Sequence, residues 1–358
     1  MQSEQQPKLD VTTPVNCGAD VFVQMLNAND VDFLFINSGT DTFPIQESIA
    51  KFNAEGYRTP KVVLCPDEST ALAAAHGHFM VSRKPQVVLV HVDAGTGQIA
   101  GGMHNAQRGR AGIVVCAGRA PMTFDGEMAG TRSMGIHWTQ EQLDQPGILR
   151  NFTKWDYEIR RSENIEYVMQ RAFQLTSSEP SGPVYLMLPR EVLMEPVVAA
   201  KIPSINRHAA LTTPQADLKG LKQAAEWLVK AQSPLIIAGH SGRNIDSVDL
   251  LVELVDLTGA QGVSDGMYMN FPTDNPAYVG PSADPYVGQA DVILSIDQEV
   301  PYIPAQARPK PDAKIINIDI DPVKPSIPLW VFPTDLLLHA DSAKALRVLN
   351  GLVKEFIT

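Results

Sequence analysis

Cysteine is scarce in this sequence. Only Cys17, Cys65 and Cys116 occur among its 358 residues, and they lie far apart without the CxxC spacing of a zinc or redox site. A disulfide framework is therefore excluded as the basis of the fold. Free thiols in a reducing compartment are expected instead.

Positive charge and long apolar runs are also in short supply. The chain has 29 lysines and arginines against 40 aspartates and glutamates, a formal net charge of −11. Because a polyanion-binding surface requires clustered cations, nucleic acid is not an expected partner. The apolar runs are too short to span a bilayer, and the polar N-terminus has no apolar signal core. These features predict a cytoplasmic protein without a membrane partner.

The sequence does contain a repeated alternation of short apolar strands, loops and helical patterns. Apolar strands without period-two alternation are typical of a parallel sheet that helices cover on both faces. The alternation is interrupted by an aperiodic segment rich in proline, serine and threonine, which predicts a linker. We therefore predict two open, doubly wound α/β domains, with a polar tail at 1–15, a first domain at 16–196, a linker at 197–214 and a second domain at 215–358.

Glu68 opens a helical segment of small residues directly after the apolar strand 61–64. A carboxylate at such a corner can be tuned to hold or share a proton near neutral pH, as a catalytic acid does. The helix dipole equally favours acidic residues in the first turn of any helix. This stretch alone leaves both interpretations open.

Other polar clusters follow the predicted strands. Ligands of doubly wound sheets gather where strands end and helices begin. Such loops lie at 37–40, which contains Ser38 and Gly39, and at 91–98, which contains His91 and the expected loop 93–98. A further cluster at 135–141 lies in an irregular stretch.

These motifs, in this order, resemble the thiamine-diphosphate-dependent enzymes of the acetolactate synthase, benzoylformate decarboxylase and 2-hydroxyacyl-CoA lyase superfamily. The segment VLVHVDAGTGQIAGGMHNA at 88–106 is similar to the benzoylformate decarboxylase pattern of a histidine followed by an alanine-glycine-threonine-glycine loop. The segment SPLIIAGHSGRN from Ser233 onward is similar to the start of the middle domain of the same enzymes. The resemblance implies a pyrimidine-binding domain followed by a Rossmann-like middle domain.

The resemblance also implies a function. The chain would be the pyrimidine-binding subunit of a lyase, decarboxylase or carboligase that performs acyl-anion chemistry on a 2-oxo acid or 2-hydroxy ketone. Glu68 would contact the ring nitrogen of the cofactor's aminopyrimidine and promote its activation. Further cofactor contacts would come from Ser38, Gly39, Thr96, Gly97 and Gln98.

Four residues are implied as the substrate pocket: His91, His137, Trp138 and Gln140. The resemblance gives His91 a proton-handling role, and the usual pKa of histidine suits it. The alternative for His91 is a structural histidine at the end of a buried strand. For His137 and Trp138 the alternative is an aromatic cluster that packs an interdomain surface.

The third domain of this superfamily binds the cofactor's diphosphate through Mg²⁺, with a Gly-Asp-Gly segment and a downstream asparagine. No such arrangement occurs here, since Ser264–Gly266 belongs to the middle-domain resemblance. The prediction is that this chain holds no metal ligand and that a separate subunit supplies the Mg²⁺ site. That subunit would cover an apolar patch on the first domain, in a heterotetramer or larger assembly with a homodimeric core. A non-catalytic scaffold or regulatory paralogue is the alternative, and the presence of Glu68 favours catalysis.

Overall fold

The computed structural model describes residues 11–197, 199–202, 209–266 and 268–358. The chain divides into two units, Met1–Leu211 and Thr212–Thr358, with the division inside the predicted linker. Each unit is an α/β domain built on a parallel sheet, as predicted from the apolar strands.

The sheet of the first unit has six parallel strands. Their order across the sheet is β3 (Lys61–Leu64), β2 (Phe33–Ile36), β4 (Gln86–Val90), β5 (Ile113–Arg119), β7 (Val184–Pro189) and β6 (Trp155–Glu158). Because β2 is followed by β3 on one side and has β4 on its other side, the winding direction reverses between β2 and β4.

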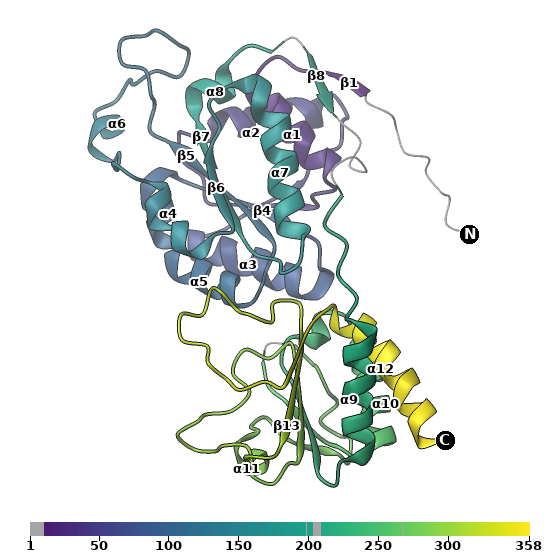
Figure 1. The fold of residues 1–358 in the computed structure, drawn as a ribbon. Helices are drawn as coiled ribbons and strands as arrows, with labels where there is room; N and C mark the ends of the chain where they lie inside the picture. The colour runs from purple at the N-terminus through teal and green to yellow at the C-terminus, as the bar shows by residue number, and fades with distance from the viewer. Residues whose placement is uncertain (1–10, 198, 203–208, 267) are drawn as a thin grey trace. The chain divides into compact units, whose positions relative to one another are not determined.

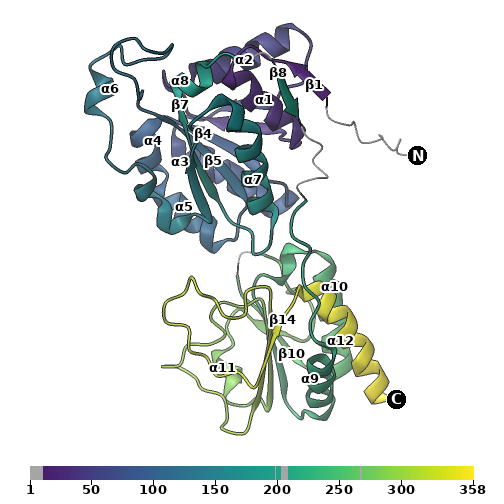
Figure 2. The same ribbon diagram turned by 45° about the horizontal axis from the view of Figure 1, so that its top comes forward.

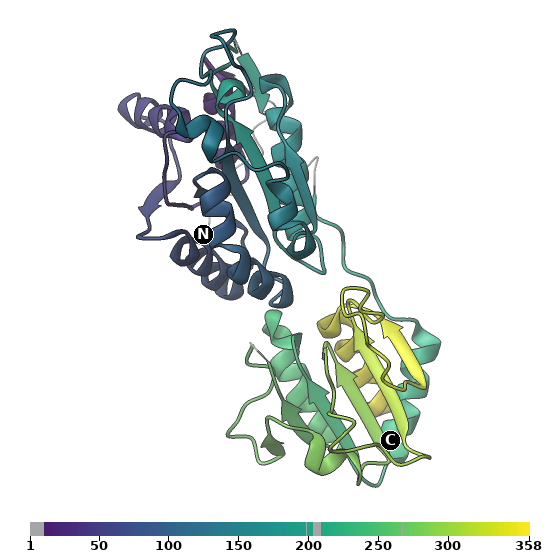
Figure 3. The ribbon, with the colours of Figure 1, turned by 90° about the vertical axis from the view of Figure 1, so that its left-hand side faces the viewer.

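Helices cover both faces of this sheet (Figures 1 and 3). One face packs against α1 (Gly18–Ala28), α2 (Phe43–Ala54) and α7 (Ile165–Ser177), and the other against α3 (Glu68–Ser82) and α5 (Ala100–Arg108). Alternate residues of β4 serve the two cores: Val87 and Leu89 join the first, and Val88 and Val90 the second. This division explains why the strand is apolar throughout.

Short elements complete the first unit. The helix α4 (Val92–Gln98) follows β4, and α8 (Arg190–Met194) follows β7. A long excursion between β5 and β6 contains the single turn α6 (Ile136–Thr139) and extends away from the sheet in Figures 1 and 2.

The second unit contains another six-stranded parallel sheet. Its order is β11 (Tyr278–Gly280), β10 (Gln261–Ser264), β9 (Pro234–Ala238), β12 (Val292–Ile296), β13 (Lys314–Asp319) and β14 (Leu336–His339). One face packs against α9 (Leu218–Lys230), α10 (Asp246–Thr258) and the C-terminal helix α12 (Ser342–Ile357). A smaller core on the other face includes the turn α11 (Asp284–Val287).

The predicted tail and the predicted linker each contain a short strand. The strand β1 (Val11–Pro14), within the predicted tail, pairs antiparallel with β8 (Ala199–Ile202), within the predicted linker. Neither four-residue strand carries a long apolar run, so the hydrophobic pattern did not reveal them. Residues 1–10 of the predicted tail and 203–208 of the predicted linker lie outside the described residues.

Candidate active site

The first unit gathers its polar clusters at the carboxyl ends of β2, β3 and β4, where the winding of the sheet reverses. Asn37 ties these three ends together: its backbone N–H donates to Leu89 O at 3.1 Å, and its side-chain amide donates to Cys65 O at 3.1 Å. In a doubly wound sheet this reversal is the usual ligand crevice. The predicted site residues Ser38, Gly39, Glu68 and His91 all lie on the loops or helix starts of this edge.

Glu68 is the first residue of α3, but Asp67 caps that helix. The Asp67 side chain accepts hydrogen bonds from the Thr70 backbone N–H and hydroxyl, both at 2.8 Å. The half-buried carboxylate of Glu68 is therefore not needed as the cap. It lies beside Gly95 of α4, where a Cβ would be 3.1 Å from Glu68 Oε1.

His91 pairs with Asp41, a residue that was not among those predicted from the sequence. Asp41 Oδ1 lies 2.5 Å from His91 Nδ1, and Asp41 Oδ2 accepts from the Val92 backbone N–H at 3.2 Å. Asp41 is only 5% exposed, whereas the His91 side chain is 30% exposed. The signal that could have found Asp41 is its place in the β2–α2 turn, opposite the loop that carries His91.

The electrostatic surroundings of His91 are acidic. The hydrogen bond to Asp41 is the main cause that raises the pKa of His91, while burial opposes it. The charges of Asp41, Glu68 and Asp93 act in the same direction as the hydrogen bond. The imidazolium form is therefore favoured at this position.

Asp93, two residues beyond His91, is a buried carboxyl group. Its Oδ1 accepts from the Gln142 backbone N–H at 3.3 Å, and its Oδ2 has no hydrogen-bond partner in the described part of the chain. Burial raises the pKa of Asp93. Asp93 is thus an acidic neighbour of His91. Among the described contacts, no cationic side chain is bonded to Asp93.

The predicted loop 93–98 is instead the helix α4, and its glycines hid this from the sequence pattern. Thr96 holds the helix from inside: its hydroxyl donates to Val92 O at 2.6 Å and lies 2.6 Å from the Tyr185 hydroxyl. Gln145 Nε2 donates to the same Tyr185 oxygen at 2.9 Å. The Thr96 side chain is fully buried, so its predicted role toward a cofactor is not available to its hydroxyl in this arrangement.

The neighbouring positions of α4 are open. Gly97 and Gln98 are exposed, and a Cβ at Gly97 would meet nothing within 4 Å. Ser38 is also exposed, whereas Gly39 is half-buried against the His91 ring. The bare backbone around Gly97 lets a ligand approach closely.

The other predicted substrate residues lie on the excursion that contains α6. His137 is 2% exposed; its Nδ1 accepts from the Ser133 backbone N–H at 3.1 Å, and its carbonyl accepts from Arg132 at 2.5 Å. Burial lowers the pKa of His137. Trp138 is 46% exposed, and Gln140 is half-buried. His137 thus holds the excursion together from inside, while Trp138 faces outward.

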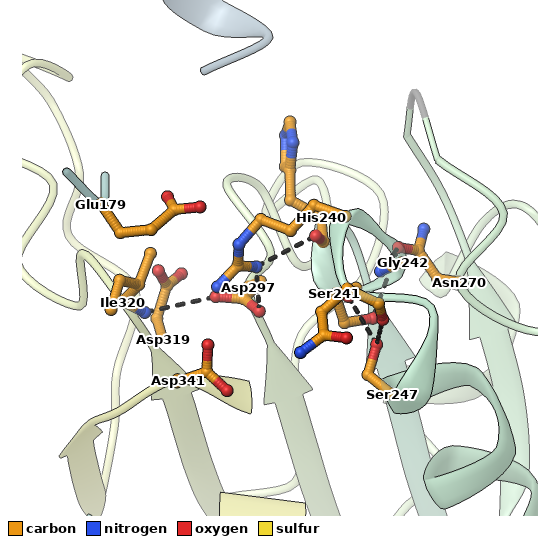
Figure 4. Close-up of polar contacts among 12 residues, drawn as sticks. Glu179, His240, Ser241, Gly242, Ser247, Asn270, Asp297, Asp319, Ile320 and Asp341 are labelled. Carbon is orange, nitrogen blue, oxygen red and sulfur yellow. Dashed lines mark hydrogen bonds and ion pairs between the residues drawn. The ribbon is translucent and has the colours of Figure 1, made fainter. Parts of the chain in front are cut away.

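The second unit has its own polar edge (Figure 4), around the glycine-containing turn AGHSGRN. The buried Arg243 donates to Asp297 Oδ2 at 2.5 Å, and Asp297 Oδ1 accepts from the Ile320 backbone N–H at 3.2 Å. The two glycines serve internal packing, because a Cβ at Gly239 would lie 2.6 Å from Asp297 O, and one at Gly242 would lie 2.1 Å from Met269 O. These close approaches make the segment a tight turn after β9.

The described ranges contain neither a metal-ligand cluster nor a membrane-spanning helix. No group of three or more His, Cys, Asp or Glu side chains in these ranges could hold a metal ion. Within the same ranges, no helix is both long enough and apolar enough to cross a membrane.

Comparison with known proteins identifies the family. Residues 16–148 match the thiamine pyrophosphate enzyme N-terminal TPP binding domain, and residues 221–349 match the thiamine pyrophosphate enzyme central domain. The chain belongs to the thiamine pyrophosphate enzyme family. The predicted family and domain types are therefore confirmed.

Individual relatives agree with this family. The chain is 26% identical to the acetolactate synthase large subunit of Lactococcus lactis over 97% of its own length and 59% of that protein. It is 25% identical to the benzoylformate decarboxylase of Pseudomonas aeruginosa over 65% of its own length and 41% of that protein. The crystal structure of benzoylformate decarboxylase from Polynucleobacter necessarius has the same fold, with a TM-score of 0.79 at 19% identity, over 95% of this chain and 61% of that one. The chain spans about half the length of the curated relatives it matches.

The family implies thiamine diphosphate, and the first unit fits the pyrimidine half of this cofactor. Glu68 would offer a carboxylate to a ring nitrogen, the absence of a side chain at Gly95 leaves space beside that carboxylate, and the backbone at Gly97 is exposed. When bound, the cofactor would supply a carbon nucleophile for addition to a carbonyl group, and its ring would store the electrons of the carbanion that results.

Proposed function

We propose that this chain is the pyrimidine-binding subunit of a thiamine-diphosphate-dependent lyase, decarboxylase or carboligase that acts on a 2-oxo acid or 2-hydroxy ketone. The observation that carries the proposal is the meeting of Glu68, Gly95 and His91 at the point where the winding of the sheet reverses. Because Asp67 already caps α3, the carboxylate of Glu68 is available to contact a ligand. The carboxylate can hold or receive a proton at the cofactor ring, and the imidazole can exchange one with the substrate.

The similarity to benzoylformate decarboxylase supports protonation by His91 as part of this function. The His91 Nδ1 is engaged by Asp41, so its Nε2 is the atom that can exchange a proton. A histidine with a raised pKa retains a proton to donate at neutral pH. This arrangement favours a reaction that ends in protonation at carbon or oxygen, as decarboxylation and lyase reactions do.

The diphosphate and its Mg²⁺ are proposed to be held by a second subunit. A diphosphate requires a metal ion or several convergent donors to balance its charge, and this chain carries a net charge of −11. The described residues offer no cluster of metal ligands. The proposal is therefore that the active site forms between this chain and a polypeptide with a Gly-Asp-Gly diphosphate-binding domain, in a heterotetramer or larger assembly.

A surface on the first unit supports such a partner. We call it the excursion patch: six large apolar side chains between β5 and β6, each at least 44% exposed, namely Met122, Phe124, Met134, Ile136, Trp138 and Leu143. The base of the excursion is held in place, since Glu191 accepts from Thr123 at 2.8 Å and Arg190 donates to Gly130 O at 2.7 Å. An ordered apolar surface of this kind is typical of a protein interface.

The first prediction tests the function through Glu68. With the chain co-expressed beside a Gly-Asp-Gly-containing partner encoded in adjacent DNA, turnover of 2-oxo acids should require thiamine diphosphate. Glu68→Gln should lower kcat by about 10²–10⁴-fold, because the amide cannot exchange the proton that a general acid or base moves.

Asp67→Asn is the matched control, since asparagine caps a helix about as well as aspartate and keeps the neighbouring position polar. It should retain turnover. Equal activity of the Glu68→Gln and unsubstituted enzymes would exclude the proposed role of Glu68. Cofactor binding without turnover of any 2-oxo acid or 2-hydroxy ketone would favour a scaffold.

A further inference from the structure

We propose that Asp41 is the positioning residue for His91: its carboxylate fixes the tautomer and the direction of the imidazole, so that Nε2 is the proton-donating atom. This inference rests on the proposed function, because it assigns His91 a proton to transfer. It adds a residue that lies outside the residues implied by the sequence motifs.

The hydrogen-bond geometry defines the tautomer. A carboxylate can only accept hydrogen bonds, so Nδ1 of His91, 2.5 Å from Asp41 Oδ1, must carry a hydrogen. The proton that is exchanged is then the one on Nε2. In the transfer step the Nε2–H bond breaks, the proton passes to a basic substrate atom, and His91 becomes neutral with its remaining hydrogen on Nδ1. Solvent returns the proton, since the His91 side chain is 30% exposed.

The backbone next to His91 has an unfavourable conformation that contacts with Asp41 help to hold. Val92 has φ of +26°, a conformation that a β-branched residue rarely adopts. The second oxygen of Asp41 accepts from the Val92 backbone N–H at 3.2 Å. One carboxylate therefore holds both the His91 ring and the strained turn that directs it. Such strain persists only where the surroundings over-determine it, and it is concentrated at functional sites.

Two glycines provide the space that this pair occupies. A Cβ at Gly118 of β5 would lie 1.5 Å from Asp41 Oδ2, and a Cβ at Gly39 would lie 1.9 Å from His91 Nδ1. Any other residue at either position would displace the pair. The Asp41–His91 pair therefore depends on the absence of a side chain at Gly118 of β5 and at Gly39 of the turn after β2.

The charged groups that face His91 all act in the same direction. They come from three elements: Asp41 from the turn before α2, Glu68 from the start of α3, and Asp93 from α4. Asp41 alone bonds the ring, and its hydrogen bond is the largest contribution to the raised pKa of His91. A purely structural tie between the ends of β2 and β4 would fix the same tautomer, so turnover and its pH profile are the measurements that distinguish positioning from a structural role.

The experiment is a pH titration by NMR of the full chain with ¹³C- and ¹⁵N-labelled histidine, without cofactor or substrate. The His91 signals are identified by their loss in His91→Gln. We expect His91 to titrate above the usual histidine range and, when neutral, to carry its hydrogen on Nδ1. A titration at or below the usual range, or a neutral ring protonated on Nε2, would overturn the proposal even if no Asp41 variant folds.

Two variants then separate the effect of the Asp41–His91 hydrogen bond on the pKa of His91 from the effect of nearby negative charge. Asp41→Asn should lower the pKa of His91 and mix its neutral tautomers, whereas Asp93→Asn, which removes a nearby charge but no bond to the ring, should lower the pKa less. An equal effect of the two variants would overturn the role of the bond.

Turnover by the assembled enzyme completes the test. Asp41→Asn should lower kcat at least tenfold with little change in KM, and should move the limb of the pH profile that requires a protonated group to lower pH. An unchanged profile would contradict positioning. If Glu68→Gln retained full turnover while the NMR results held, the proposed function would fail and the Asp41–His91 coupling would stand.

Discussion

Among single residues, His91, directly after β4, is the one whose protonation should affect both stability and the proposed reaction. His91 is held by Asp41, and three carboxylates face it. A basic group whose pKa is raised by folding stabilises the folded state when it is protonated. The ionic part of the Asp41–His91 contact is therefore a source of pH-dependent stability as well as of reactivity.

The prediction at this scale concerns that stability. The contribution should be fully present below the unfolded histidine pKa of about 6.5 and should be lost as pH rises through the raised folded value. The loss of unfolding free energy in Asp41→Asn should thus be larger at pH 6 than at pH 9. Urea unfolding of the whole chain, with the ¹³C signal of His91 reporting the first unit, measures both values.

The control is the same comparison in a His91→Gln background, where the pH dependence of the Asp41→Asn effect should disappear. A stability difference between the Asp41→Asn variant and the unsubstituted chain that is independent of pH would show that the contact contributes only packing and neutral hydrogen bonding.

Among the elements, α4 is the one that the sequence pattern misjudged. Its two glycines are poor helix formers, and its first residue has a strained φ, so local preference favoured a loop. The helix is stabilised by contacts from elsewhere in the first unit, chiefly Tyr185 of β7 and Gln145 from the excursion. Tertiary contacts of this kind cannot be read from a local window of sequence.

The prediction for α4 is that Tyr185→Phe destabilises the first unit by about 1–3 kcal/mol, because the buried polar groups of Thr96 and Gln145 each lose one hydrogen bond. Amide hydrogen exchange in α4 should accelerate. Tyr157→Phe on the neighbouring strand β6 is the control, since its hydroxyl takes no part in this network, and should change exchange in α4 little. Unaltered exchange in α4 of Tyr185→Phe would contradict the role of the network.

The strands show what the sequence could and could not predict. The apolar runs located β2, β3, β4 and β5 to within a few residues, because strands buried on both faces are apolar throughout. The positions of Glu68 and His91 followed from such strands, and their proposed roles came from the resemblance to the family. Asp41 did not, because its partner lies 50 residues away and only the order of strands in the sheet brings them together.

For the whole molecule, the proposed function requires assembly with a second subunit. The first unit presents the excursion patch, and its exposed side chains include Phe124 and Trp138, which lie edge to face with ring centroids 5.9 Å apart. Aromatic side chains of this kind often supply most of the binding energy of an interface.

The prediction at this scale is that the double variant Phe124→Ser, Trp138→Ser binds the diphosphate-binding subunit at least about tenfold more weakly, with unchanged unfolding of the isolated chain. Tyr167→Ser on α7, also an exposed aromatic position at 63%, is the control and should bind normally. Calorimetry or sedimentation of the two purified chains measures the affinity. Normal binding by the double variant would place the interface elsewhere.

The space at Gly118 has a consequence for how the first unit folds. The carboxylate of Asp41, the ring of His91 and the bare backbone of β5 come from three strand ends, and they fit only when β2, β4 and β5 are paired in register. No fragment that contains one of these loops alone should show the raised acid–base midpoint of His91. The raised pKa of His91 therefore reports that the three strands have paired. During refolding it should appear together with the last of these strand pairings.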